Sequence, residues 1–451
     1  MPKARKPKKP DHLKPVLAAL EASDNAQVNG ILAELHPADI ARILEGLPPE
    51  PRTTVWAQVD ILHMGEVLLE LPEAVRTDLV KLMDDKALVA AAHALDIDDI
   101  ADLIPDLSDE VIAEILFDLD KQDRHRLDAV LSYPEDTAGG LMNVDAITVR
   151  ENITLEVVLR YLRRRDELPE HTNRLFVVNR SDRLIGDLKL SKLLTADPKA
   201  RVSQVMERDL VKFTALTPDK EVAAAFENYN LISAPVVDEN SRLLGRITVD
   251  DVVDVIREQA DRQVLAPAGL SEDQDIFAPV ARSIRRRGIW LGVNLITAFI
   301  ASWVIGLFEQ VIQQVVALAV LMPIVASMGG NAGTQTLTLV VRGLAVGTIS
   351  ESNARRLLMR ELMIGAVNGL IWALVVAVVA IWWYANLVIG AIIAAAMIIN
   401  LAFAALSGVA IPFLVRRFGV DPALASGVIL TTVTDVVGFF AFLGLATLFL
   451  L

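Results

Sequence analysis

Short apolar stretches separated by prolines fill the chain up to about residue 131. Leu, Ile, Val and Ala recur there at spacings of three and four residues, which is the pattern of amphipathic helices. The segments resemble one another loosely: residues 31–41 and 67–75 each read as a short helix that ends at a proline before a new start. Because elements this short cannot bury a face alone, we expect them to stack into a helical array, wound in either hand.

From about residue 137 the pattern changes to short β-rich runs that occur twice. The run 176–186 parallels the run 235–245, and a Met-containing pair opens each copy at 141–142 and 205–206. Each copy predicts a strand, a helix, a β-rich run, a polar turn, a second strand and a closing helix. This duplication resembles a tandem pair of CBS domains, small α/β modules that pack as a pseudo-twofold disc.

A connector follows at about 262–287, with breaks at Pro267, Gly269 and Pro279. Its acidic run 271–275 is typical of a helix N-terminus, where the helix dipole favours negative charge. Arginines at 282 and 285–287 stand just before the first long apolar segment, which is where a cytoplasmic membrane boundary is expected.

Five apolar segments, each near the ~20 residues that span a bilayer, lie at about 288–308, 311–327, 362–384, 387–415 and 423–451. Basic residues precede the first segment, join the second to the third and join the fourth to the fifth, while the turns near Glu309 and Asn386 have none. With the N-terminus inside, every basic loop is cytoplasmic and the C-terminus lies outside. The small and polar residues of 322–336 predict a broken helix, a helix packed closely through Gly329, Gly330 and Gly333, or both.

Composition separates the apolar segments from what precedes them. Of the 43 basic and 57 acidic residues, six and five respectively follow Gly288, so the first part carries a formal charge of -15 and the apolar part +1, which together give the -14 of the chain. Such acidity argues against nucleic acid as a partner and favours cations. The chain has no Cys, which excludes disulfides and thiolate metal sites and fits a reducing compartment. The basic start lacks the apolar region of a signal peptide, so we expect a disordered cytoplasmic tail.

The fifth apolar segment contains a carboxylate, Asp435, which follows Thr431, Thr432 and Thr434. A charged side chain at bilayer depth costs about 3 kcal/mol or more and usually faces a water-filled cavity or an ion path. The alternative is an acid that stays neutral or bonds to neighbouring Thr hydroxyls inside a helix bundle. Asp435 is the one acid well inside a predicted segment, because Glu361 falls at the end of its own.

The closing helix of the second CBS-like copy carries acids that permit two interpretations. Asp250, Asp254 and Glu258 recur at i, i+4 and i+8, which places three carboxylates along one helix face. Like charges so placed repel unless a cation or a basic partner intervenes. One interpretation is therefore a cation site, and the other is a solvated acidic face.

The resemblance to CBS domains also implies a nucleotide site. CBS pairs often hold adenine nucleotides through a Gly-x-x-Thr-x-x-Asp run, which the second copy has as Gly245, Thr248 and Asp251, while the first copy, at 186–192, lacks both the Thr and the Asp. The resemblance implies at most one ATP site, at Thr248 and Asp251.

Three motifs together resemble the MgtE magnesium channel/transporter family: the run 133–142, the Gly-rich run 323–335 and the run 431–435. The resemblance covers nearly the whole chain in order. It implies a multidomain membrane protein with a disordered basic tail at 1–12, an all-α superhelical N domain at 13–136, an α/β tandem CBS pair at 137–200 and 201–262, a connector (plug) helix at 263–287 and a pore domain of five transmembrane helices at 288–451.

What the resemblance implies for function is Mg²⁺ import across the inner or plasma membrane by a homodimer with its pore at the subunit interface. Asp435 would face its symmetry mate and hold a hydrated Mg²⁺, with Thr431, Thr432 and Asn331 supplying further oxygen ligands. Mg²⁺ prefers octahedral oxygen coordination and gives up water reluctantly. Binding through the water shell also permits the release that conduction requires.

In the family, cytoplasmic Mg²⁺ bridges acids of the N domain, the CBS pair and the connector helix and so closes the pore. The resemblance carries this role to eight acids: Asp250, Asp251, Asp254 and Glu258 of the CBS pair, Asp98 and Asp99 of the N domain, and Asp273 and Asp275 of the connector, the stretch that departs most from the family pattern.

Two other functional classes stay open from the sequence. One is a membrane receptor that senses ions or nucleotides through the CBS pair, although a receptor needs neither Asp435 nor a broken second span. The other is an exporter of another divalent cation, coupled to H⁺ or Na⁺, for which a second titratable group inside the membrane is expected. We do not expect an enzyme, because no nucleophile–base pair or Walker-type loop occurs in the sequence.

Overall fold

The computed structural model describes residues 12–165, 167–271 and 274–451. The chain divides into two compact units, Met1–Gln259 with Asp273–Pro279 and Ala260–Glu272 with Val280–Leu451. The fold class predicted from the sequence is confirmed: an all-helical N-terminal part and a CBS-like pair lie in the first unit, and five long apolar helices lie in the second.

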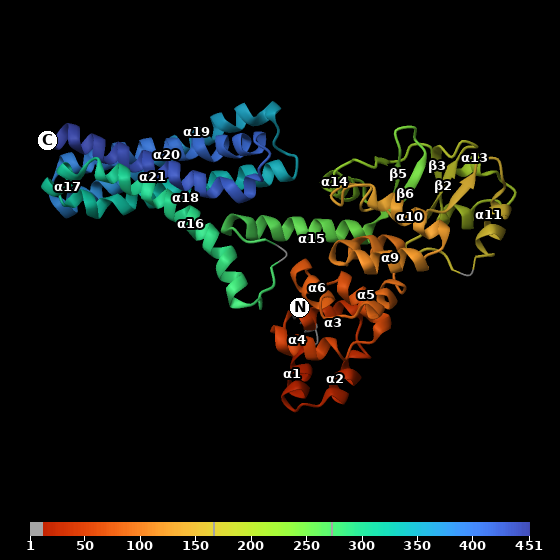
Figure 1. Cartoon of the computed structure of the whole chain (residues 1–451). Coiled ribbons are helices and arrows are strands. Elements are labelled where there is room, and N and C mark those ends of the chain that lie inside the picture. The colour runs from red at the N-terminus through yellow and green to blue at the C-terminus, as the bar shows by residue number, and fades with distance from the viewer. Residues whose placement is uncertain (1–11, 166, 272–273) are drawn as a thin grey trace, which may run out of the picture. The chain divides into compact units, whose positions relative to one another are not determined.

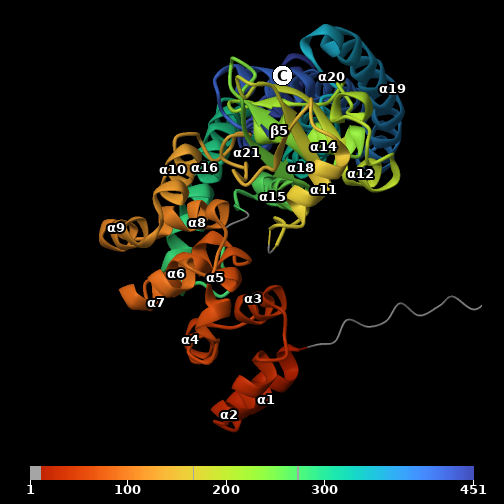
Figure 2. The same cartoon turned by 90° about the vertical axis from the view of Figure 1, so that its right-hand side faces the viewer.

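Ten short helices make up the N-terminal part (Figure 2). They are α1 (Leu13–Glu21), α2 (Asn25–Leu32), α3 (Pro37–Glu45), α4 (Pro49–Trp56), α5 (Ile61–Leu69), α6 (Glu73–Val80), α7 (Asp85–Ala92), α8 (Ile97–Leu103), α9 (Asp109–Asp118) and α10 (Lys121–Leu131).

These helices follow a period of 12 residues that the loose comparison of segments missed. The residues that cap α2 to α9 stand at 24, 36, 48, 60, 72, 84, 96 and 108, and Asp, His, Ser or Pro occupies each position. Asp, Ser and Asn favour a helix start because their side-chain oxygen accepts a backbone N–H, and Pro fits the entry to a helix. The helix starts therefore mark the 12-residue period in the sequence.

Each helix of the array packs its apolar face against its neighbours. Helices α3, α5, α7 and α9 pack in succession, and a continuous apolar core runs through them from Val16 to Val130. The predicted helical array is confirmed. Position 52 departs from this apolar pattern. Ile40 and Met64, 12 residues before and after it, belong to the apolar core, whereas the buried residue at position 52, on α4, is Arg52.

Two three-stranded sheets form the CBS-like pair. The first contains β1 (Thr148–Arg150), β2 (Arg174–Val178) and β3 (Leu184–Lys189), with α11 (Leu155–Leu162), α12 (Leu190–Thr195) and α13 (Val202–Val205). The second contains β4 (Phe213–Thr214), β5 (Ser233–Val237) and β6 (Leu243–Thr248), with α14 (Asp219–Tyr229) and α15 (Val249–Leu265).

The two copies share register as well as element order. In each, the first strand is parallel and the third antiparallel to the middle strand, and the antiparallel partners include Val177 with Gly186 and Val236 with Gly245. A β-bulge follows at the same place in both. Gly is required at 186 and 245, because an added Cβ would lie 2.5 Å from the carbonyl oxygen of Glu207 or Asn143. The predicted duplication is confirmed.

The connector does not form the helix expected at its acidic run. After α15 ends at Leu265, a short 3₁₀ turn, Ala266–Ala268, lies against α21, and the next helix begins at Val280. Within the described residues from 271 to 275 no helix begins, so the prediction of a helix N-terminus there is wrong.

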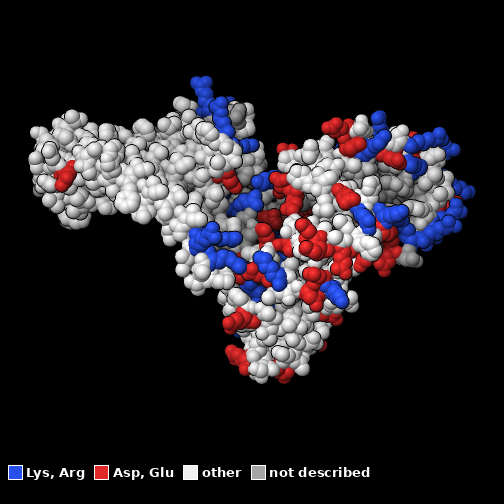
Figure 3. Space-filling model, in the orientation of Figure 1, with Lys and Arg blue, Asp and Glu red and all other residues white. Residues whose placement is uncertain are grey.

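The second unit contains α16 (Val280–Gly306), α17 (Glu309–Gln314), α18 (Ala317–Ala345), α19 (Glu351–Tyr384), α20 (Leu387–Arg417) and α21 (Pro422–Leu450). All except α17 are long and apolar enough to cross a membrane. Helix α20 is the most buried and packs against α18, α19 and α21, which run alongside one another (Figure 1). On the face in Figure 3 these helices carry few charged side chains along most of their length.

The second span differs from its prediction. Residues 309–314 form a separate helix, and α18 continues without a break through the Gly-rich run to Ala345, with Pro323 inside it. The prediction of a broken helix is wrong, and the prediction of close packing is confirmed. An added Cβ on Gly329 would lie 2.2 Å from the side chain of Asn400, and an added Cβ on Gly333 would lie 3.0 Å from the side chain of Leu430. Small residues allow helices to approach this closely in a membrane.

Candidate functional site

Asp435 lies on α21, partly buried, and none of the described residues forms a hydrogen bond or ion pair with it. The neighbouring Thr hydroxyls donate to backbone carbonyls one turn earlier in the same helix: Thr431 to Gly427 at 2.8 Å, Thr432 to Val428 at 2.7 Å and Thr434 to Leu430 at 3.1 Å. The alternative in which these hydroxyls bond to Asp435 is therefore wrong.

Thr431 and Asn331 lie near one another on different helices. Thr431 is exposed and stands one turn before Asp435 on α21, and an added Cβ on Gly330 of α18 would lie 4.0 Å from its methyl group. The next residue, Asn331, is also exposed, and its amide donates to Ser327 at 3.3 Å. The structure thus brings the Gly-rich run and the Thr/Asp run together and leaves their oxygens at the surface of a single chain.

A second acid lies inside the membrane unit, and sequence reasoning had set it aside. Glu361 belongs to α19, is 5% exposed, and accepts a hydrogen bond from Thr336 of α18 at 3.1 Å. Helix α19 begins ten residues before Glu361, at Glu351, and three arginines, at 355, 356 and 360, stand between them. That Asp435 is the one acid well inside a span stays a prediction.

Acids of the N-terminal helices face acids of the CBS-like pair. Burial, followed by the charges of Asp102, Asp96 and Asp250, raises the pKa of Asp99 to about 7. Asp99 is on α8 and Asp250 is in the first turn of α15, so part of this repulsion acts between the two parts of the first unit. Asp99 therefore lies close enough to Asp250 for their charges to interact, while the bridging of these acids by Mg²⁺ stays a prediction.

Two further acids with such neighbours, Asp96 and Asp254, were not predicted to face acids of the other part. Burial and then the charges of Asp145 and Glu170 raise the pKa of Asp96, while burial and then the charge of Glu70 raise the pKa of Asp254. Asp254 stands one turn after Asp250 on α15, as the predicted face requires. In the described residues no group of three or more Asp, Glu, His or Cys side chains is arranged to hold a metal ion directly.

Other predicted regulatory residues have different outcomes. Asp251 and Glu258 lie on α15 as expected. The side chain of Asp98 and the whole of Asp273 lie outside the described residues. Asp250 also lies 3.4 Å from the imidazole Nε2 of His171, where a protonated His would act as its counter-charge.

Asp275 was predicted to bind a cation, but it forms a buried ion pair with Arg52. Both its oxygens accept hydrogen bonds from the guanidinium of Arg52, at 2.8 and 2.9 Å, and both side chains are almost fully buried. Arg52 also donates to the carbonyls of Leu44 and Leu47 at 2.9 and 2.8 Å. The guanidinium occupies the carboxylate, so the predicted cation role of Asp275 is contradicted.

The predicted nucleotide residues, Thr248 and Asp251, bond to one another. Thr248 is 5% exposed, and both its hydroxyl and its backbone N–H donate to Asp251, at 3.1 and 3.2 Å, at the start of α15. This local pair satisfies the first turn of the helix. An ATP site at Thr248 and Asp251 stays a prediction.

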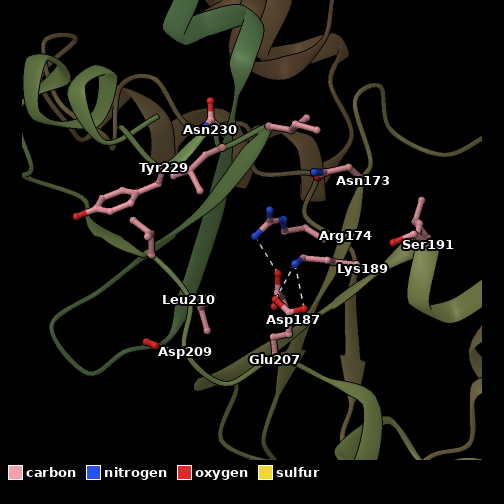
Figure 4. Close-up of a pocket in the computed structure, with 14 residues that line it drawn as sticks. Asn173, Arg174, Asp187, Lys189, Ser191, Glu207, Asp209, Leu210, Tyr229 and Asn230 are labelled. Carbon is pink, nitrogen blue, oxygen red and sulfur yellow. Dashed lines mark hydrogen bonds and ion pairs between the residues drawn. The ribbon is translucent and has the colours of Figure 1, made fainter. Parts of the chain in front are cut away.

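A cavity of about 620 Å³ lies instead at the first copy (Figure 4), lined by segments of both copies. Two ion pairs stand in it, Arg174 with Asp187 at 2.9 Å and Lys189 with Glu207 at 2.8 Å. Burial raises the pKa of Asp187, although Arg174 opposes it, and the hydrogen bond from Lys189 lowers the pKa of Glu207. The ring of Tyr229 is exposed at one side of the cavity.

Comparison with known proteins agrees with this architecture. A family model described as a divalent cation transporter, MgtE, matches residues 322–445, the MgtE intracellular N domain matches 35–136, and the CBS domain matches 138–199 and 202–258. The magnesium transporter MgtE of Thermus thermophilus is 33% identical over 96% of this chain and 97% of its own length. The chain belongs to the MgtE family.

Other MgtE proteins and solved structures extend the comparison. The magnesium transporter MgtE of Bacillus subtilis is 30% identical over 93% of each chain. A crystal structure of the cytosolic domain of the Mg²⁺ channel MgtE in complex with ATP is 34% identical, with a TM-score of 0.49, and covers 54% of this chain and 99% of that one. The resemblance to the MgtE family seen in the sequence is confirmed.

Proposed function

We propose that this chain is a Mg²⁺ channel that admits the ion to the cell, that two copies form the pore, and that Asp435 of each holds the hydrated ion. The observation that carries the proposal is an acid within a membrane-spanning helix with no partner among the described residues. Such an acid requires a cation, a proton or water. The 33% identity to a magnesium transporter over nearly the whole chain supports Mg²⁺ as that cation.

The surroundings of Asp435 suit an ion that keeps its water. Thr431 and Asn331 add oxygens at the same surface, and the Thr hydroxyls donate to backbone carbonyls, so their oxygen lone pairs remain available to water. Mg²⁺ usually keeps several waters and is held by one or two carboxylates. A second copy of the chain would add a second Asp435 carboxylate and enclose the exposed oxygens between the two copies. The proposed topology has the N-terminus in the cytoplasm and the C-terminus outside.

The experiment is Mg²⁺ flux into liposomes that contain the full chain. Asp435→Asn keeps the shape of the side chain and removes its charge, so we expect flux to fall by at least about tenfold, the effect of ~1.4 kcal/mol. Glu309→Gln is the matched control, because Glu309 is an acid of the same unit in the short helix α17 and should not affect flux. Wild-type flux in Asp435→Asn would rule out the pore assignment.

We also propose that Mg²⁺ on the cytoplasmic side closes the pore by bridging the acids that face one another in the first unit. Burial, followed by repulsion from the neighbouring carboxylates of Asp102, Asp96 and Asp250, raises the pKa of Asp99 to about 7, so a cation at this contact would offset both costs of its charged form. Water-mediated Mg²⁺ between Asp99 and Asp250, and between Glu70 and Asp254, would relieve that repulsion. Helix α15 continues from these acids to Leu265, where the following 3₁₀ turn lies against α21, the helix of Asp435.

The gating proposal is tested with Asp250, Asp251 and Asp254 replaced together by Asn. With fewer carboxylates to bridge, flux should persist at Mg²⁺ concentrations that close the wild type. Asp261→Asn, a change of the same kind farther along α15, serves as control. Inhibition at the wild-type Mg²⁺ concentration in the triple variant would reject this role while leaving the pore proposal intact.

A second ligand, an adenine nucleotide such as ATP, is proposed for the cavity at the first copy. Its volume falls within the ~300–1,000 Å³ of small-molecule sites. Two cations line it, yet Asp187 and Glu207 pair with them and Asp209 adds a further acid. The cavity thus fits a nucleotide by size, while its acids favour a phosphate accompanied by Mg²⁺ over a bare triphosphate.

A further inference from the structure

Asn400 is a polar residue in the most apolar part of the protein. It lies in the middle of α20, has 0% exposure, and stands beside Ala396, Met397, Leu401 and Ala404, which are also buried. An amide in such surroundings costs about 1–3 kcal/mol for each hydrogen-bonding group left without a partner. Its presence therefore needs a structural or functional reason.

The amide connects three helices. Its Nδ2 donates to the carbonyl oxygen of Val325 on α18 at 2.8 Å. An added Cβ would lie 2.2 Å from Nδ2 at Gly329 of α18 and 2.7 Å from it at Gly438 of α21. A side chain at either glycine would displace the Asn400 amide, which touches the backbone of both helices.

These two glycines lie beside the proposed ion-binding residues. Gly438 follows Asp435 by three residues, about 4.5 Å along the helix axis. Gly329 precedes Asn331 by two residues. The amide of Asn400 therefore sets the separation of α18 and α21 at the level where Asp435 and Asn331 project.

The hydrogen bond to Val325 is what orients the amide. In the described part of the chain, Oδ1 of Asn400 accepts no hydrogen bond. A Leu of similar size would avoid that cost and still fill the space. We infer that Asn400 is a positioning residue of the pore, fixing α18 and α21 around Asp435; this inference rests on the proposed channel function.

The test is the apparent KM for Mg²⁺, and the ratio of Mg²⁺ to Mn²⁺ flux, of the full chain in liposomes. Asn400→Leu keeps the volume and loses the hydrogen bond, and Asn400→Asp keeps the shape and loses the N–H donor. For both we expect the KM to change by about three- to tenfold, the effect of one lost hydrogen bond, with a shifted flux ratio. A role in stability alone would lower the maximal flux of all ions equally and leave both quantities unchanged.

Two further variants complete the design. Asn294→Leu is the matched control, because the Asn294 amide donates to Trp290 of its own helix, α16, at 2.9 Å and links no helices. Gly438→Ala tests the same contact from α21 if the Asn400 variants do not fold, and it should shift the KM likewise. Wild-type KM and flux ratio in the folded variants overturn the inference.

Asp435→Asn, measured in parallel, separates this inference from the proposed function. If it abolishes flux while the Asn400 variants keep their KM, only the positioning role is rejected. If it leaves flux unchanged, the pore proposal fails and the inference fails with it.

Discussion

Replacing Arg52 by Met should release the segment that precedes the first membrane helix. Arg52 and Asp275 are 223 residues apart in the chain, and their side chains are 3% and 1% exposed. Arg52→Met fills most of the same volume but leaves the Asp275 carboxylate buried without its partner. Breaking a buried ion pair in this way costs about 3–5 kcal/mol.

The magnitude converts directly into a rate of hydrogen exchange. If the segment 274–279 separates from the N-terminal helices more readily by about 3 kcal/mol, its backbone amides should exchange about 100-fold faster, because ~1.4 kcal/mol is a factor of ten. The amide of Phe277 is the most informative, since it donates to Asp275 Oδ1 at 2.8 Å. Mass-spectrometric hydrogen exchange on the full-length protein measures this segment separately from helices α1 to α10.

Three variants show whether the ion pair itself is responsible. Arg42→Met is the control, because Arg42 forms an exposed pair with Asp39, and such pairs contribute about 0–1 kcal/mol. Asp275→Leu combined with Arg52→Met removes both charges and should recover part of the protection lost in Arg52→Met alone. If Arg52→Met exchanges at 274–279 no faster than Arg42→Met, the segment is not held by this pair and the reasoning is wrong.

Two other predictions follow from the site geometry. Since the pKa of Asp99 is about 7 in the folded chain and 3.8 when unperturbed, the contact between α8 and α15 is favoured at low pH, weakens as pH rises from about 4 and is weakest above about 7. In EDTA, spin labels at Ala94→Cys and Ile256→Cys in this Cys-free chain should report more of the close state at pH 6 than at pH 8. Asp99→Asn should reduce that difference, the remainder coming from Asp96 and Asp254, whose pKa values are also raised. An unchanged pH response in this variant would contradict the assignment. For the cavity, Lys189→Ala should weaken ATP binding about ten- to hundredfold in equilibrium dialysis, the effect of one charged hydrogen bond, whereas Lys199→Ala should not. Weakening by Thr248→Val alone would place the nucleotide at the second copy.

Local patterns in the sequence determined most of the architecture. The five spans follow from apolar length, because a bilayer requires about 20 such residues, and the CBS-like pair follows from a duplicated run whose strands alternate and pair within each copy. Asp435 was identifiable because a lone acid in an apolar stretch is conspicuous without any neighbour. The 12-residue period of the N-terminal helices was also present in the sequence, at the capping positions, although comparison of apolar runs alone did not detect it.

The tertiary structure decided which distant residues share a site. Asp275 forms an ion pair with Arg52, and Glu361 accepts a hydrogen bond from Thr336. Asn400 contacts the backbones of two glycines on other helices. Periodicity and capping act over a few residues, so they place a side chain on a face of its own helix but say nothing about what the next helix presents to it. Charge and hydrogen-bonding partners are chosen by packing between elements, and for this reason an acid such as Asp275, which in the sequence resembles a cation ligand, is in the folded chain half of a buried ion pair.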